Sequence, residues 1–177
     1  MAAGVPDGID VRRHRDWEGR VLERFVPKTL FLLVCALPVL ALFNVFGQKP
    51  DVKTVANPTG MATMTVSAPS KIRSGLLFQA RIDIHAKREI KDAVLVLEQG
   101  WLESLTLNTS EPAPANETSK NGSIALDLGG IPAGKVWRQY LEFQANPVNA
   151  GRQSQDVALY DGNVPLLHLN RDLMVWP

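Results

Sequence analysis

An uncharged apolar run constrains this chain of 177 residues more than any other feature. Residues 29–46 have the sequence TLFLLVCALPVLALFNVF, in which Leu, Val, Phe and Ala dominate and no side chain is charged. A helix of this length covers about 27 Å, close to the ~30 Å hydrocarbon core of a bilayer. A helix in the core of a soluble domain usually shows a polar stripe, which this run lacks. We therefore predict one transmembrane helix over residues 26–47.

The charges that flank the run predict its orientation. Residues 1–28 carry six Lys and Arg against five acidic residues, whereas only two lysines closely follow the run. Flanks rich in Lys and Arg stay on the cytoplasmic side. Residues 1–25 are therefore predicted to be a cytoplasmic tail, and residues 48–177 to lie outside a plasma membrane that the chain crosses once. A signal peptide cleaved near Val45-Phe46-Gly47 is the alternative, but the long charged leader and long apolar run favour a retained anchor.

The tail carries one apolar stripe at helical spacing. Trp17, Val21 and Phe25 recur at i, i+4 and i+8 among arginines and acidic residues. This pattern predicts an amphipathic helix on the inner surface of the lipid bilayer. A frayed extension of the membrane helix is the alternative.

Beyond the run, the pattern changes to that of strands. Residues 48–60 hold two prolines and a glycine, which predicts a linker. From residue 61, apolar and polar residues alternate, most clearly in Phe78–Ala86, and Asp161-Gly162 signals a hairpin. The further strands are predicted at Met61–Ser67, Ala93–Leu97, residues 124–128, Val136–Ala145, Asp156–Tyr160, Val164–Leu169 and Leu173–Trp176. Seven or eight short strands over residues 61–177 predict an all-β immunoglobulin-like Greek-key sandwich.

One stretch adds a resemblance. Phe143–Asn163, FQANPVNAGRQSQDVALYDGN, is similar to the strand, Asn-x-Gly loop, strand and Asp-Gly turn of bacterial cell-surface immunoglobulin-like repeats. The layout of tail, apolar run and β-rich domain also resembles uncharacterised single-pass membrane proteins of actinobacteria. The resemblance implies a fold and an envelope location, and it implies no chemistry.

Composition and motifs argue against several function classes. Residues 48–177 carry thirteen charges of each sign, so they lack the basic footprint that nucleic acid requires. The sole cysteine, Cys35, lies in the apolar run, and neither a nucleophile elbow nor a phosphate-binding loop is present. We therefore expect neither an enzyme nor a bound cofactor or metal. His85 shares a strand face with Asp83, which we interpret as a solvated charged face rather than as a general base.

Metal binding is the weakest of the alternatives that stay open. Met61 and Met64, with His85 and His168, have the sulfur and imidazole ligands that suit copper. Residues three apart on a strand point to opposite faces, however, so the two methionines cannot easily share one ion. Calcium is not indicated, since Asp156 and Asp161 are isolated in the sequence.

Residues 105–123 are rich in Ser, Thr, Asn, Glu and Pro, and we predict one long exposed loop there. The stretch holds three glycosylation sequons, at Asn108, Asn116 and Asn121. They can carry glycans only in a secretory pathway of the eukaryotic kind.

What remains is binding to a partner. Trp101, Trp137 and Tyr140 are candidate contacts, and Trp137 and Tyr140 cannot both face inward on a regular strand. Asn44, near the outer end of the apolar run, either meets interfacial water or bonds to another helix. We predict a non-enzymatic accessory subunit whose sandwich docks on another membrane or envelope protein. A module that binds cell wall or carbohydrate, and an envelope copper protein, are the alternatives.

Overall fold

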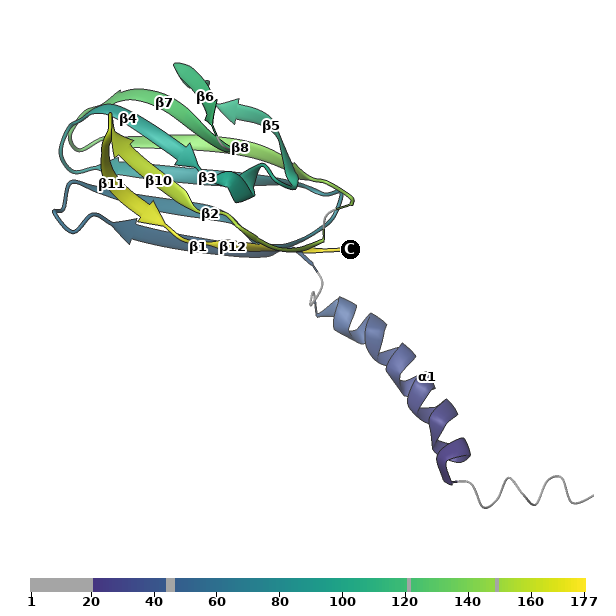
Figure 1. Cartoon of the computed structure of the whole chain (residues 1–177). Helices are drawn as coiled ribbons and strands as arrows, with labels where there is room; N and C mark the ends of the chain where they lie inside the picture. Colours follow the sequence, from purple (N-terminus) through teal and green to yellow (C-terminus); the bar gives the residue numbers. More distant parts are fainter. Residues whose placement is uncertain (1–20, 44–46, 121, 149) are drawn as a thin grey trace, which may run out of the picture. The chain divides into compact units, whose positions relative to one another are not determined.

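The computed structural model describes residues 21–43, 47–120, 122–148 and 150–177. The chain divides into two compact units, Met1–Val45 and Phe46–Pro177. The first unit contributes one helix and the second contains all the strands of the described residues (Figure 1). Each unit is considered on its own below.

The helix α1 spans Val21–Leu42 and includes Pro27 and Pro38. Its stretch Phe25–Leu42 is long and apolar enough to cross a membrane, and none of it is buried. Thr29 donates its hydroxyl hydrogen to the carbonyl of Phe25 at 2.8 Å, which satisfies the only polar side chain of this stretch apart from Lys28. The helix includes Val21–Phe25, which were predicted to be the end of the cytoplasmic tail. The rest of the predicted tail stripe, with Trp17, and the candidate contact Asn44 lie outside the described residues.

Two sheets form the second unit, and together they confirm the predicted all-β immunoglobulin-like sandwich. The larger sheet has the order β5-β8-β3-β2-β12-β9, and β1 pairs with β2. Its strands are β1 (Lys49–Ala56), β2 (Ala62–Arg73), β3 (Leu77–Ala86), β5 (Leu105–Glu111), β8 (Val136–Ala145), β9 (Gly151–Ser154) and β12 (Asp172–Trp176).

The smaller sheet has five strands in the order β11-β10-β4-β7-β6. Its strands are β4 (Ile90–Leu97), β6 (Asn116–Lys120), β7 (Ser123–Ile131), β10 (Val157–Asp161) and β11 (Val164–Leu169). A short 3₁₀ helix, η2 (Gln99–Trp101), follows β4. The pair β10–β11 closes through Gly162 and Asn163, which confirms the hairpin predicted at Asp161-Gly162.

Alternate residues of both sheets meet in one apolar core. In β3, for example, Ile82 and Ile84 are fully buried while Arg81 between neighbouring core positions is exposed. The Phe143 ring stacks on Phe78 at 5.6 Å between centroids and contacts the Trp101 ring at 5.0 Å. Burial of this kind is the main stabilisation open to a domain without a disulfide.

Three details of the sequence-based prediction are wrong. The predicted linker contains β1, which pairs with β2 from Lys49 to Ala56. The predicted loop over residues 105–123 contains two strands, β5 and β6. The strand β9 (Gly151–Ser154) was not predicted either, so the described residues hold twelve strands rather than seven or eight. The missed strands lie at or near sheet edges, where one or both faces are exposed to solvent and the alternation of apolar and polar residues is weak.

A buried arginine ties the segment before β12 to β2 and to Gln155. Arg171 is 2% exposed and lies between β11 and β12. Its guanidinium donates to the carbonyls of Ala68 and Pro69 at 3.2 and 2.9 Å and to the side-chain oxygen of Gln155 at 2.6 Å. The Cζ atom lies 5.5 Å from the centre of the Trp101 ring, within reach of a cation–π contact. Burial lowers the pKa of Arg171, but an arginine keeps its proton at physiological pH.

A close backbone approach fixes the position of η2 against β9. A Cβ atom on Gly100 would lie 1.6 Å from the carbonyl oxygen of Ser154. No side chain fits that space, so only glycine allows the 3₁₀ helix to lie against this strand. The approach also sets the depth at which Trp101 enters the core.

We expect Arg171→Ala to lower the free energy of unfolding of the sandwich by about 3 kcal/mol, because it leaves buried carbonyl acceptors without a donor. The matched control is Arg152→Ala. Arg152 is exposed and pairs with Asp172 at 2.7 Å, so its loss should cost far less than the loss of Arg171. Urea denaturation of the full-length variants in mild detergent measures both. Equal losses for the two variants would show that the buried arginine is not a structural tie.

Gly100→Ala should destabilise the sandwich by about 3 kcal/mol, because η2 or β9 must move to remove the clash. The control is Glu103→Ala, which alters an exposed side chain close to the same turn. Trp101 fluorescence and thermal unfolding of the two variants test this. A Gly100→Ala protein as stable as the control would contradict the close approach.

Candidate functional site

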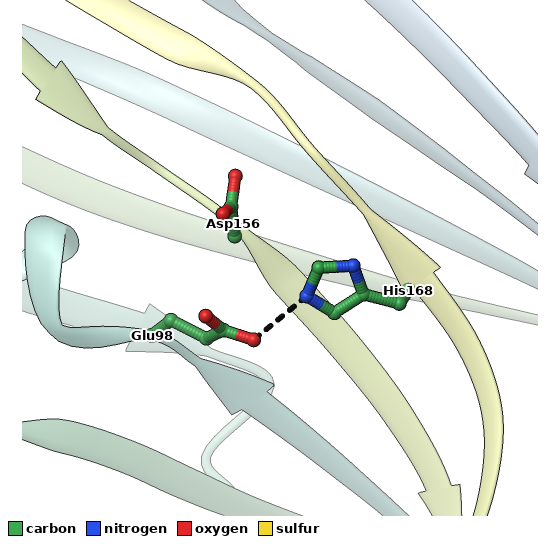
Figure 2. A group of neighbouring side chains, drawn as sticks. All are labelled: Glu98, Asp156 and His168. Carbon is green, nitrogen blue, oxygen red and sulfur yellow. Dashed lines mark hydrogen bonds and ion pairs between the residues drawn. The ribbon is translucent and has the colours of Figure 1, made fainter.

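Three side chains that can ligate a metal meet at one end of the five-stranded sheet. Glu98 follows β4, Asp156 precedes β10 and His168 lies in β11. One ligand atom from each lies within 4.8 Å of the other two. Figure 2 shows the three side chains and the contact between His168 Nε2 and Glu98 Oε1, which measures 2.8 Å. The His168 and Glu98 side chains are 49% and 41% exposed, so solvent reaches the cluster.

Strand pairing and backbone bonds hold the cluster together. The backbone carbonyl of Asp156 accepts hydrogen bonds from Glu98 N and from Trp101 Nε1, both at 3.1 Å. Its carboxylate Oδ1 accepts from the backbone N–H of Arg171 at 3.0 Å. The acid is therefore fixed from two sides and keeps its second carboxylate oxygen for another interaction. The arrangement can bind a cation or hold an imidazole–carboxylate ion pair.

Sequence reasoning missed this cluster, because it treated Asp156 as isolated. Leu97 and Leu169 each pair with Val157 across the sheet, and this pairing brings the three ligands together. Each of the three ligands directly precedes or follows an apolar strand residue, and the sequence shows this. The order of the strands in the sheet, which brings the ligands together, cannot be read from the sequence.

The copper constellation considered from the sequence does not form. His85 lies on the outer face of β3 in the larger sheet, whereas His168 lies on the outer face of the smaller sheet. Met64 is fully buried in the core between them. Sulfur and both imidazoles therefore cannot reach one ion.

A charged surface covers the outer face of β3 and β8. Asp83 accepts from Arg138 at 2.6 Å and lies 3.1 Å from Arg81. The hydrogen bond from Arg138 to Asp83 is the main cause that raises the pKa of Arg138. His85 is exposed on the same face, and Asp83 forms its ion pairs with Arg81 and Arg138. This is the solvated charged face that the sequence predicted.

The candidate contacts divide between core and surface. Trp101 is fully buried, so it belongs to the core and cannot be a contact. Trp137 is partly buried against the core, and its Nε1 donates to Gln139 Oε1 at 3.1 Å. Tyr140 occupies the opposite face of β8, as the alternation required. The fully buried Gln139 also donates to Ser110 Oγ and to the carbonyl of Pro112.

The outer face of the five-stranded sheet has an apolar centre, bordered by the polar side chains of Asp127 and His168. In its central strand β4, Val94 and Val96 point away from the core and are half-buried. Ala158 and Ala125 flank Val96 across the sheet, and Tyr160 flanks Val94. We call this set, Val94, Val96, Ala125, Ala158 and Tyr160, the apolar face; Ala158 within it is buried and the other four are half-buried. It contrasts with the charged surface on the other side of the sandwich.

Comparison with known proteins gave distant matches among solved structures and none among family models or curated proteins. A non-cellulosomal cohesin from the archaeon Archaeoglobus fulgidus aligns with 64% of this chain and 91% of its own, at 12% identity and a TM-score of 0.43. CaCohA2 from Clostridium acetobutylicum aligns with 63% of this chain and 89% of its own, at 13% identity and a TM-score of 0.43. At these values the similarity assigns neither a family nor an activity.

Proposed function

We propose that the chain is a non-enzymatic docking subunit whose apolar face binds the external part of another membrane or envelope protein, while α1 tethers the sandwich to the plasma membrane. The observation that carries the proposal is the composition of β4. Its second half, Ala93–Leu97, is apolar on both faces, and the outward-pointing Val94 and Val96 are half-buried, whereas Lys91 and Asp92 near its start are exposed. An antiparallel sheet that faces water on one side normally carries polar residues there.

The two outer faces of the sandwich provide an internal comparison. The charged surface on β3 and β8 follows the ordinary alternation, with Arg81, Asp83 and Arg138 in ion pairs. The apolar face of the smaller sheet has valine, alanine and tyrosine in the equivalent outward positions. An apolar sheet face of this kind marks a surface that a partner covers.

The partner's chemistry follows from the border of the apolar face. Asp127 pairs opposite Val94 on one side, and Glu98 follows the end of β4. A matching partner would present an apolar centre with basic side chains at its border. The membrane tether favours a partner in the same bilayer, because it raises the effective concentration of one surface beside the other.

The alternative of a carbohydrate-binding module has less support. It needs a groove lined by exposed aromatic side chains. Trp101 is buried, and the half-buried Tyr140 and Tyr160 lie on the outer faces of different sheets. These aromatic side chains therefore cannot line one groove.

The topology is tested in intact cells. Added protease should degrade the sandwich and leave the N-terminal tail protected, because the Lys- and Arg-rich flank stays inside. Detection uses one epitope at each end of the chain, and the chain should stay in the membrane pellet after alkaline carbonate extraction. A protein released at the size expected for cleavage near residue 47 would establish the signal-peptide alternative.

The docking surface is tested with a photoreactive residue in place of Val96 in native membranes. We expect a crosslink to one membrane protein, which should then form a stoichiometric complex with the full-length chain from purified components. Val96→Lys should weaken that complex by about 100-fold, because it puts a charge into the centre of the contact. Thr65→Lys on the outer face of β2 is the matched control and should leave the affinity unchanged. Similar crosslinks from Val96 and Thr65 positions, or equal affinities of the two lysine variants, would refute the apolar face as the docking surface.

A further inference from the structure

We propose that Glu98, Asp156 and His168 form a binding site for a single Zn²⁺ ion. This inference rests on the cluster alone and does not depend on the docking proposal. The site combines two carboxylates with one imidazole, which come from the end of β4, the start of β10 and the middle of β11.

The spacing of the ligand atoms fits a small ion after minor side-chain rotation. Zinc binds His nitrogen and carboxylate oxygen at about 2.0–2.2 Å, so tetrahedral ligands lie about 3.3 Å from one another. The His168 Nε2 and Glu98 Oε1 atoms are 2.8 Å apart and need to separate by only a few tenths of an ångström. The third ligand atom, from Asp156, lies within 4.8 Å, and rotation of the two more exposed side chains, Glu98 and His168, can bring the three ligand atoms closer together.

The framework beneath the ligands is already fixed. Asp156 is held by bonds to Glu98 N, Trp101 Nε1 and Arg171 N, so its carboxylate position depends on backbone and core groups. His168 lies in a paired strand opposite Ala158. A site with rigid supports loses little conformational entropy when the ion binds.

The electrostatics favour a cation. Two carboxylates within a few ångströms of each other repel when both are ionised, and one imidazole can offset at most one of their charges. A divalent ion neutralises both carboxylates and accepts the neutral imidazole as its third ligand. The exposed sides of Glu98 and His168 leave an entry path and a fourth position for water.

The ligand set selects the class of ion. Calcium takes six to eight oxygen ligands and magnesium prefers oxygen and water, so an imidazole in a three-residue site suits neither. Thioether and thiolate ligands, which select Cu(I), are absent from the cluster. Imidazole with carboxylates and an open position is a zinc arrangement.

The test uses full-length protein in mild detergent, stripped with EDTA and then titrated with ZnCl₂ by calorimetry. The expected result is one Zn²⁺ per chain and a higher melting temperature, because the ion joins three segments of the sheet. His168→Gln and Glu98→Gln should each weaken binding by about 100-fold. Both replaced side chains are partly exposed, and circular dichroism checks that the variants fold.

The chain's other two histidines provide the control. The double variant His14→Gln/His85→Gln removes both and should keep the affinity of the unaltered protein. Loss of binding in this double variant, binding that His168→Gln leaves unchanged, or no zinc binding by the unaltered protein would each overturn the site. In the last case the contact between His168 and Glu98 is only an ion pair.

Discussion

The buried guanidinium of Arg171 is the interaction that ties the C-terminal part of the sandwich to β2. It takes its acceptors from Ala68 and Pro69 in β2 and from Gln155, in the segment that leads from β9 of the larger sheet to β10 of the smaller. A buried charge is costly unless hydrogen bonds satisfy it, and three acceptors with an aromatic ring do so here. The same residue's backbone N–H holds the carboxylate of Asp156. Arg171 therefore contributes its side chain to the packing against β2 and its backbone N–H to the candidate metal site.

The two outer faces of the sandwich differ in their relation to water. On β3 and β8, ion pairs between exposed charged side chains form a polar face that is stable in contact with water. On β4 and β10, valine, alanine and tyrosine form a surface whose burial is favourable. Each Å² of apolar area removed from water contributes about 25 cal/mol of stabilisation. This asymmetry, rather than a catalytic group, is the feature that favours a docking role. The cluster of Glu98, Asp156 and His168 lies beside the apolar face, since His168 pairs opposite Ala158.

The sequence predicted the interior of the fold better than its edges. The strands Val136–Ala145 and Val164–Leu169 were predicted with their observed bounds, because their alternation or apolar character is strong. The edge strand β6 is polar and exposed, and its composition cannot be told from that of a loop. Trp101 was proposed as a contact, but the close approach of Gly100 to Ser154 carries it into the core. The candidate metal site depends on pairs such as Leu97 with Val157, which are sixty residues apart and carry no local signal.

The central claim is that a partner covers the apolar face in the native membrane. Val96→Cys and Thr65→Cys, each combined with Cys35→Ser, place one thiol on each outer face at half-buried strand positions. A membrane-impermeant maleimide then measures the labelling rate of each thiol, first in intact cells and then in the purified protein. The account predicts that the thiol at position 96 reacts much more slowly in cells than after purification, whereas the thiol at position 65 reacts at the same rate in both. Equal rates for position 96 in cells and in purified protein would contradict it.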